Sequence, residues 1–210
     1  LLFYVDATPG SSIDDPERPS IPDEGDKEEP KPDEDENVTG TLAFEDIWPS
    51  GGDYDMNDVI VEYERKVYFD KKNIVTKIVD EFTPVHDGAT YVNAFAYQID
   101  AAQIGDKITL PEGAILEKET SSIIVMSNAK QNIGNKYVVT REFNGSFLKN
   151  QLLSYNPYII VKYSQGKRNR TEVHLPKHKA TAYANQSLIG SNDDAYYIDR
   201  KGAYPFAIDI

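Results

Sequence analysis

The sequence predicts an all-β fold, a two-sheet β-sandwich, and three observations support this class. Short segments of alternating apolar and polar residues recur along most of the chain, and a period of two is typical of half-buried strands. Gly, Pro and Asn residues separate these segments. Only two short segments, 100–104 and 146–153, could form helices. A chain of 210 residues can bury one sizeable core, and jelly-roll connections are one form that such a sandwich takes.

The N-terminal residues divide into a short apolar segment and an acidic linker. Residues 1–8, LLFYVDAT, predict a strand, which is either the tail of a preceding module or a strand of this domain's own sheet. Residues 9–40 hold half of the chain's 12 prolines. Between Asp14 and Glu36 there are 12 acids and 3 bases, a net charge of −9 out of −13 for the chain. This composition predicts a disordered, self-repelling linker.

The rest of the chain, 41–210, predicts one domain of about ten short strands. Segments 59–69 and 74–82 alternate well, and the polar turn 70–73 between them predicts a hairpin. The further predicted strands are 90–99, 107–110, 122–126, 136–143, 158–163, 170–175, 195–198 and 203–208.

The domain is organised around residues 44–63, which predict a strand, a turn rich in Pro and Gly, a tight acidic loop and a second strand. Leu42, Phe44, Asp46 and Trp48 share one face of the first strand, because side chains alternate along a strand. Asp46 therefore lies on a face that is otherwise apolar. A carboxylate that points at a core needs a hydrogen-bonding partner or a cation.

The loop that follows carries oxygen ligands at close spacing. Asp53, Asp55 and Asn57 occupy alternate positions, and Asp58 comes directly after them. All are oxygen donors, and such a set suits a hard cation such as calcium. The sequence therefore predicts a Ca²⁺ site formed by Asp46, Asp53, Asp55, Asn57 and Asp58. The alternative is an acidic hairpin turn in which Asp and Asn act as ordinary turn formers.

At these residues the chain also resembles a known family. The run LAFEDIWPSGGDYDMNDVIVEY resembles the signature of the LruC domain, a domain of unknown function in surface proteins and lipoproteins of Bacteroides-like bacteria. The similarity continues through 80–84, 91–98 and 172–176 and covers roughly residues 41–210. It implies an extracytoplasmic, β-rich module at the cell surface or outer membrane, without an assigned reaction.

The chain departs from the family pattern in two places. It has Ala94-Phe95-Ala96 where family members carry a Gly, and Lys177, His178 and Lys179 where they carry an acid after HLP. The resemblance also implies that family members extend beyond the position that corresponds to Ile210. These departures put in doubt a ligand site that the chain would share with the family there.

Two further polar groups are candidate site residues. Asp193 and Asp194 form a second acidic loop, which is a turn, a set of additional metal ligands or an acid pair. Adjacent carboxylates point apart on an extended chain, which disfavours glycosidase geometry. Lys167, Arg168 and Arg170 predict either a surface for an anionic glycan or a solvated hairpin tip. Trp48 is expected in the core, with stacking on a sugar as the alternative.

Composition excludes several functions. The net charge of −13 argues against nucleic acid or an anionic membrane as partner. The chain has no Cys, and therefore neither a disulfide nor thiol chemistry. It has no run of 18 apolar residues that would predict a membrane span. It also has no phosphate-binding glycine loop and no G-x-S-x-G elbow.

These observations together favour a calcium-stabilised extracellular module of a bacterial surface protein or lipoprotein, acting in adhesion or surface assembly. Its partner would be a glycan or another surface protein. The alternative is a carbohydrate-binding module of the same architecture. An uncharacterised hydrolase has the least support, because no nucleophile or paired acid stands out, and we expect no enzymatic activity.

Overall fold

The computed structural model describes residues 34–145, 147–189, 197–199 and 204–210. The predicted strand 1–8, most of the predicted linker, and the Asp193–Asp194 loop lie outside these residues. The start of the predicted strand 195–198 lies outside them too.

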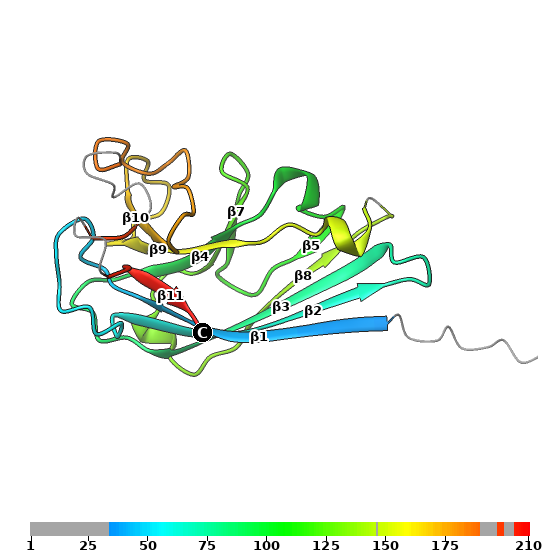
Figure 1. Ribbon diagram of the computed structural model, residues 1–210, viewed down its shortest axis with the longest axis horizontal. Coiled ribbons are helices and arrows are strands. Elements are labelled where there is room, and N and C mark those ends of the chain that lie inside the picture. Colours follow the sequence, from blue (N-terminus) through cyan, green and yellow to red (C-terminus); the bar gives the residue numbers. More distant parts are fainter. Residues whose placement is uncertain (1–33, 146, 190–196, 200–203) are drawn as a thin grey trace, which may run out of the picture. The chain divides into compact units, whose positions relative to one another are not determined.

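Two antiparallel sheets face each other in the described part of the chain (Figure 1). The first sheet has the order β11-β1-β2-β3-β8-β5, and the second has the order β10-β9-β4-β7-β6. The strands of the first sheet are β1 (Glu34–Phe44), β2 (Val59–Phe69), β3 (Val75–His86), β5 (Lys107–Thr109), β8 (Tyr137–Glu142) and β11 (Ala207–Asp209). Those of the second are β4 (Ala94–Gln98), β6 (Ile115–Glu117), β7 (Ser122–Met126), β9 (Asn156–Val161) and β10 (Thr171–His174).

The core lies between the two sheets and is built from alternate residues of their strands. Phe44 of β1 and Phe82 of β3 meet Phe95 of β4, with ring centroids 6.3 and 5.1 Å apart. Val59 and Val61 of β2 are also fully buried. β-branched and aromatic side chains fit the pleated, half-buried surface of a strand, and these segments therefore form sheets.

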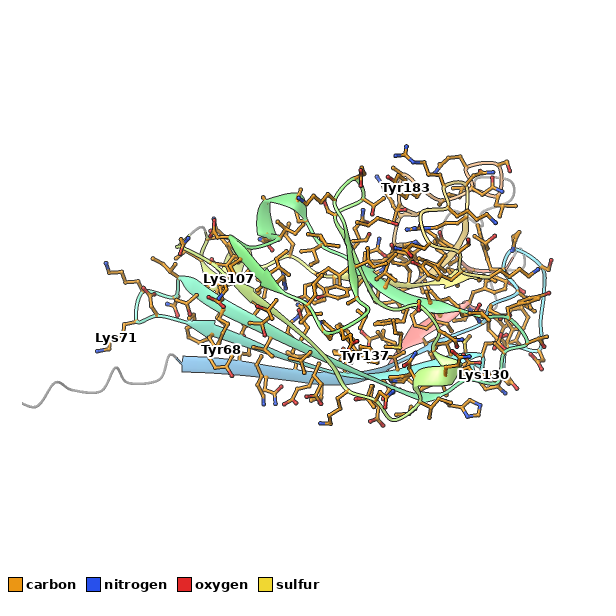
Figure 2. All side chains as sticks on the ribbon, turned by 180° about the vertical axis from the view of Figure 1, so that it is seen from behind. Tyr68, Lys71, Lys107, Lys130, Tyr137 and Tyr183 are labelled. Atoms are coloured by element: carbon orange, nitrogen blue, oxygen red, sulfur yellow. The ribbon has the colours of Figure 1, made fainter. Side chains whose placement is uncertain are left out.

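The predicted fold class, an all-β sandwich, is confirmed, and the described residues hold no α-helix. The two segments that could form helices contain short 3-10 turns instead, η1 (Ala101–Gln103) and η3 (Lys149–Gln151). A third such turn, η2 (Lys130–Asn132), was not expected. The hairpin turn at 70–73 joins β2 to β3, and Lys71 lies at its exposed tip (Figure 2). No helix in the described part is long and apolar enough to cross a membrane.

The linker that the sequence predicts up to residue 40 is too long. β1 begins at Glu34 and pairs residue for residue with β2, so that Asn37 lies opposite Lys66. Two described side chains near the start of the strand, Glu36 and Asn37, have polar partners. The Nζ of Lys149 lies 2.9 Å from Glu36, and Asn37 donates a 2.8 Å hydrogen bond to Glu64.

Candidate metal centre

The candidate centre begins where β1 ends. Strand alternation stops at Phe44, and the chain turns through residues 46–50. As a result both Glu45 and Asp46 are buried, with 1% and 4% of their surfaces exposed. The backbone N–H of Glu45 donates a 2.9 Å hydrogen bond to the carbonyl of Phe206, which fixes the start of the turn beside β11.

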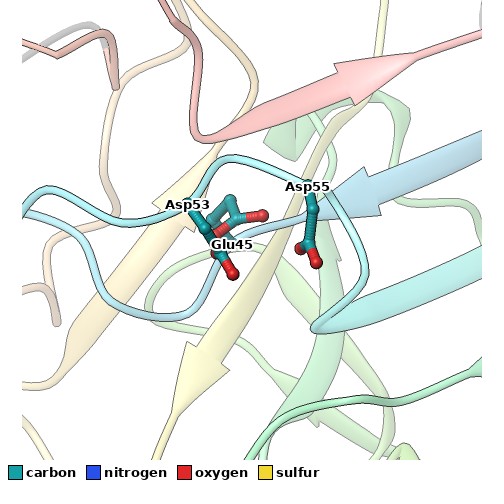
Figure 3. Close-up of side chains that lie close together, drawn as sticks. All are labelled: Glu45, Asp53 and Asp55. Atoms are coloured by element: carbon teal, nitrogen blue, oxygen red, sulfur yellow. The ribbon is translucent and has the colours of Figure 1, made fainter.

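Three carboxylates converge at this turn. Glu45, Asp53 and Asp55 each place an oxygen within 4.8 Å of the other two (Figure 3). Glu45 is supplied by the residue after β1, whereas the two aspartates come from the exposed loop that leads into β2. The group therefore joins a buried donor to two donors that are accessible to solvent.

The backbone of the loop is strained in a way that serves this arrangement. Tyr54 and Met56 have φ angles of 54° and 56°, in the left-handed region that non-glycine residues rarely adopt. Each such residue costs about 1 kcal/mol or more. They alternate with Asp53, Asp55 and Asn57 along the loop. This conformation leaves Asp53 and Asp55 on the side of the loop that faces Glu45 (Figure 3).

The electrostatics of the group favour a bound cation. Burial raises the pKa of Glu45 to about 7, and the charges of Asp58, Asp53 and Asp55 add to the increase. A 2.6 Å hydrogen bond from the Met56 N–H to Glu45 Oε1 acts in the opposite direction. Across the described residues, no Lys, Arg or His forms an ion pair with Glu45, Asp53 or Asp55.

The residues predicted as ligands lie in two groups. Asp53 and Asp55 belong to the cluster, and the Asn57 amide donates a hydrogen bond to Asp55. Asp46 points inward instead, and its Oδ2 accepts a 2.8 Å hydrogen bond from Asn93 Nδ2. Asp58 Oδ2 accepts a hydrogen bond of 2.8 Å from the backbone N–H of Asp46. Burial raises the pKa of Asp58.

Glu45 is the member of the cluster that the sequence pattern does not reveal. Strict alternation would place it on the outer face of β1. The Gly51–Gly52 pair is a sequence signal that could indicate the position of Glu45. A Cβ at Gly52 would collide with Ile47 and would lie 3.4 Å from Glu45 Oε2. Trp48, by contrast, is a core residue as expected, with its ring centroid 4.8 Å from that of Tyr197.

The predicted basic surface needs a correction. Arg170 is buried, with 3% of its surface exposed. Its guanidinium donates hydrogen bonds of 2.7 and 2.8 Å to Glu117 and one of 2.7 Å to Glu172. Lys167 and Arg168 are exposed, and Arg168 lies over the ring of Tyr183. Arg170 directly precedes β10 and lies on the same side as Glu172, two positions later, whereas Lys167 and Arg168 stay at the surface.

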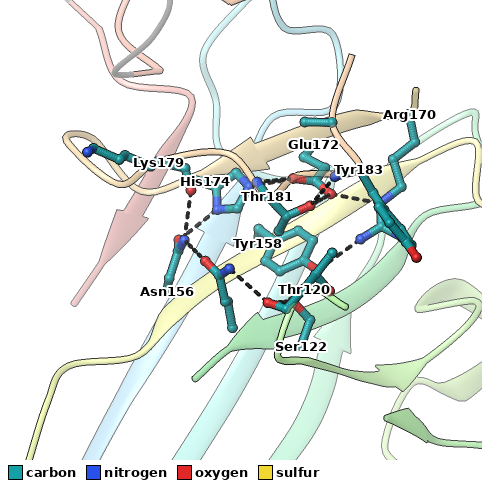
Figure 4. A network of polar contacts seen from close by, with 12 residues as sticks. Thr120, Ser122, Asn156, Tyr158, Arg170, Glu172, His174, Lys179, Thr181 and Tyr183 are labelled. Atoms are coloured by element: carbon teal, nitrogen blue, oxygen red, sulfur yellow. Dashed lines mark hydrogen bonds and ion pairs between the residues drawn. The ribbon is translucent and has the colours of Figure 1, made fainter. Parts of the chain in front are cut away.

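Arg170 belongs to a buried polar network on the second sheet (Figure 4). Glu172 accepts hydrogen bonds from Arg170 and Thr181 and lies 3.0 Å from His174 Nε2. Burial alone would raise the pKa of Glu172, but its contacts with His174, Arg170 and Thr181 lower it. The His174 ring stacks on Tyr158 at 4.4 Å. The network ties β9 and β10 to the loop that follows them.

The fold and the site define an all-β sandwich domain with a candidate metal centre in the turn between its first two strands. The chain belongs to the family described as a domain of unknown function (DUF4842), whose model matches residues 73–210. The acidic centre precedes the matched segment. No curated protein matches the chain.

One solved structure shares this fold. It is described as a "putative lipoprotein" from Bacteroides ovatus, with a TM-score of 0.60 and 17% sequence identity. The match covers 84% of this chain and 65% of the other chain. At this identity the similarity establishes the fold alone.

Proposed function

We propose that this domain is a calcium-stabilised, extracytoplasmic module of a bacterial surface protein or lipoprotein, and that Glu45, Asp53 and Asp55 hold the ion. The observation that carries the proposal is the convergence of these three carboxylates beside a loop with two left-handed residues. The proposed role is structural, in adhesion or in surface assembly, and it involves no catalysis.

Calcium suits this set of donors better than other cations. All three side chains are oxygen donors, and calcium accepts six to eight oxygens in flexible geometry, with waters and backbone carbonyls completing the shell. Magnesium requires a rigid octahedron and loses its water reluctantly. Two of the three carboxylates are exposed, which leaves space for water ligands. The ion would offset the mutual repulsion of the acids and the strain at Tyr54 and Met56.

Two similarities support a location outside the cytoplasm. The structural neighbour is described as a putative lipoprotein, and residues 42–63 resemble the LruC signature of surface proteins and lipoproteins. We extend both to this chain as part of the proposal. Calcium sites of extracellular modules bind in the range of about 10⁻⁴–10⁻³ M, and a half-exposed centre of this kind fits that range.

Isothermal titration calorimetry with CaCl₂ tests the site. The parent chain should bind one calcium ion, and Glu45→Gln should weaken binding at least about tenfold because it removes the buried charge. Glu62→Gln is the matched control, since Glu62 is exposed on β2 and lies outside the cluster. Equal affinity in the parent and in Glu45→Gln would place the ion elsewhere.

A carbohydrate-binding role is the second candidate, and one observation favours it. The rings of Tyr54 and Tyr204 stack 5.1 Å apart beside Phe206, and 55% of the Tyr204 surface is exposed. Together with Pro49 and Gly51 they line a cavity of about 690 Å³ next to the acidic loop. Aromatic faces of this kind stack on sugars.

A glycan array tests this second candidate. Binding by the parent that Tyr204→Ala abolishes would support it, with Tyr137→Ala, which lies on β8, as the control. If the parent binds no glycan on the array, with or without calcium, the carbohydrate-binding role is excluded and only the structural role is left.

A further inference from the structure

A cavity of about 390 Å³ lies between the turn that follows β1 and the loop that joins β9 to β10. Most of its lining comes from the turn 46–51 and from the segment 161–171, and Tyr91, which precedes β4, adds an aromatic ring. A volume of this size suits a small molecule, because such sites typically occupy about 300–1,000 Å³.

Two lysines on the exposed side of the cavity carry charges that no described acid neutralises. Lys162 and Lys167 line the cavity, and both are exposed. Neither forms an ion pair with any described residue, although the chain as a whole has a net charge of −13. Arg168, the next base along the loop, lies outside the cavity over the ring of Tyr183. The exposed side of the cavity therefore attracts an anionic group.

The backbone holds Lys162 in place. Its φ angle of 53° lies in the left-handed region that bulky residues rarely adopt. Its N–H donates a 3.4 Å hydrogen bond to Oδ1 of the buried Asn93, and the N–H of Tyr163 donates one of 2.8 Å to the carbonyl of Val92. The Lys162 Nζ lies 3.9 Å from the centroid of the Tyr91 ring, which is 37% exposed. Strained residues that their neighbours hold in place are frequent at functional sites.

The buried side of the cavity offers an unused donor. Trp48 lines the cavity, and its Nε1–H is buried without a hydrogen-bond partner among the described residues. Buried polar groups in folded proteins are nearly always paired. The indole N–H therefore marks a position for an acceptor oxygen of a ligand.

The same side holds Asp46, the one acid among the described residues that line the cavity. Asp46 is buried, and its Oδ2 already accepts the hydrogen bond from Asn93. Its charge would repel a simple inorganic anion that entered fully. A fitting ligand therefore keeps its negative charge beside the lysines and turns neutral polar groups inward.

A sugar acid has this distribution of groups. Its carboxylate would meet the two lysines, and its ring hydroxyls would accept from the indole N–H. Ser50, Asn169 and Thr171 add hydroxyl and amide groups to the lining. A pyranose ring also has an apolar face, and the exposed ring of Tyr91 suits it, because aromatic side chains combine a large apolar surface with a polar end.

We propose that this cavity binds the uronic acid units of an acidic glycan, with Lys162 and Lys167 at the carboxylate and Tyr91 beside the sugar ring. Of the three bases that the sequence offered for an anionic glycan, Lys167 alone lines the cavity. Arg168 lies outside it, and Arg170 is buried in the second sheet.

This site is distinct from the two sites proposed above. It uses none of the three carboxylates of the calcium centre and needs no ion. The cavity beside Tyr54 and Tyr204 shares only Ser50 and Gly51 with it among the described lining residues. The three proposals can therefore fail separately.

The test uses the full chain in chelator at low ionic strength, with trigalacturonate as the probe. Trp48 is the only tryptophan of the chain, so its fluorescence and its single indole N–H signal in an NMR spectrum report on this cavity. Both should change in a saturable way, and the indole signal should shift because the N–H gains an acceptor. High salt should weaken binding, since it screens exposed charges.

Two exposed bases provide a matched pair of variants. Lys167→Gln should weaken binding about tenfold, because it removes a hydrogen bond to a charged group. Arg168→Gln removes the same charge one position away and should bind as the parent does. Tyr204→Ala should also bind as the parent does, which separates this site from the cavity beside Tyr54.

Four results would overturn the proposal. A Trp48 signal that trigalacturonate leaves unchanged would show that the cavity does not bind it. Equal losses in Lys167→Gln and Arg168→Gln would show a diffuse attraction to the basic loop. Equal affinity for maltotriose, which has no carboxylate, would show that the lysines do not select the ligand. Equal affinity for a tripeptide of glutamate would show that the sugar ring is not recognised.

Discussion

The side-chain amide of Asn93 donates a 2.8 Å hydrogen bond to the carboxylate of Asp46, 47 positions earlier in the chain. Both residues are buried, Asn93 completely. A buried carboxylate on an apolar face needs a partner, and the amide supplies one without a cation. Asp46 therefore supports the acidic turn from within, and the candidate metal ligands are the buried Glu45 and the exposed Asp53 and Asp55.

Removal of this amide should destabilise the domain. Asn93→Ala leaves Asp46 buried without its donor, and a lost hydrogen bond to a charged group costs about 1.5–3 kcal/mol. Urea denaturation measures the loss. Asn135→Ala is the control, because Asn135 is exposed and its side chain donates only a long hydrogen bond of 3.3 Å to Asn132, in addition to its contact with Tyr137. A parent-like midpoint for Asn93→Ala would contradict this role.

Trp48→Ala should reduce the free energy of unfolding by about 3–5 kcal/mol, as for other large buried aromatic side chains. The reason is its burial against Tyr197 within the main core. Thermal and urea denaturation of the same variant measure the loss. A variant that keeps its stability but no longer binds a sugar would assign Trp48 to a ligand surface.

Arg170 and Arg168, two residues apart, should respond differently to the same change. Arg170→Met leaves Glu117 and Glu172 buried without their cation, which should cost about 3–5 kcal/mol. Arg168→Met removes a guanidinium that is exposed and rests on one tyrosine ring, and it should change stability by less than about 0.5 kcal/mol. Urea denaturation of the two variants compares them directly. Similar losses would contradict the division into a buried and a surface arginine.

The strands were the part of the fold that the sequence predicted best. Both ends of β2 and of β7 agree with the predicted segments 59–69 and 122–126, because β2 alternates and β7 is a short apolar run with polar residues on both sides. β6 was missed because three residues are too few to show a period. The start of β1 was missed because its acidic residues have the composition of the linker before it.

The sequence identified two of the three carboxylates that converge at the candidate centre, and the differences have physical causes. The spacing of Asp53 and Asp55 identified them as candidate ligands, because oxygen-donor side chains occupy every second position of the loop. Glu45 was missed because strand alternation ends at Phe44. The turn that follows buries both Glu45 and Asp46, which are consecutive in the chain. Arg170 was taken for a surface residue because its partner Glu117 lies 53 positions away, and no local pattern reveals such a pair.

The raised pKa of Glu45 gives a pH dependence with a definite sign. Its pKa is about 7 in the folded chain against an ordinary value of 4.5, so the folded state holds the proton more tightly than the unfolded state. In chelator, this group therefore stabilises the fold fully below pH 4.5, and the contribution is lost as the pH rises to about 7.

Glu45→Gln isolates this contribution. Buried groups that do not contact Glu45, such as His174, titrate alike in both proteins, so the difference between the parent and the variant reports Glu45 together with its coupling to Asp58, Asp53 and Asp55. We expect the stability of the parent relative to Glu45→Gln to fall between pH 4.5 and 7, as measured by urea denaturation in chelator. A difference that stays constant over this range would show that Glu45 does not hold its proton in the folded chain.

Calcium should raise the melting temperature of this domain. Binding to the folded form alone adds about 2.7 kcal/mol at a calcium concentration of 100 times Kd. For a chain of this size the gain corresponds to an increase of roughly 5–10 °C. Magnesium at the same concentration should raise it less.

The most direct test compares thermal melts in chelator, calcium and magnesium for the parent, Asp55→Asn and the control Glu62→Gln. The parent and Glu62→Gln should gain stability in calcium, whereas Asp55→Asn should lose most of the gain because one of the three converging carboxylates is gone. A parent that melts at the same temperature in chelator and in calcium at 100 times Kd, about 10–100 mM for an extracellular site, would contradict a calcium centre at Glu45, Asp53 and Asp55.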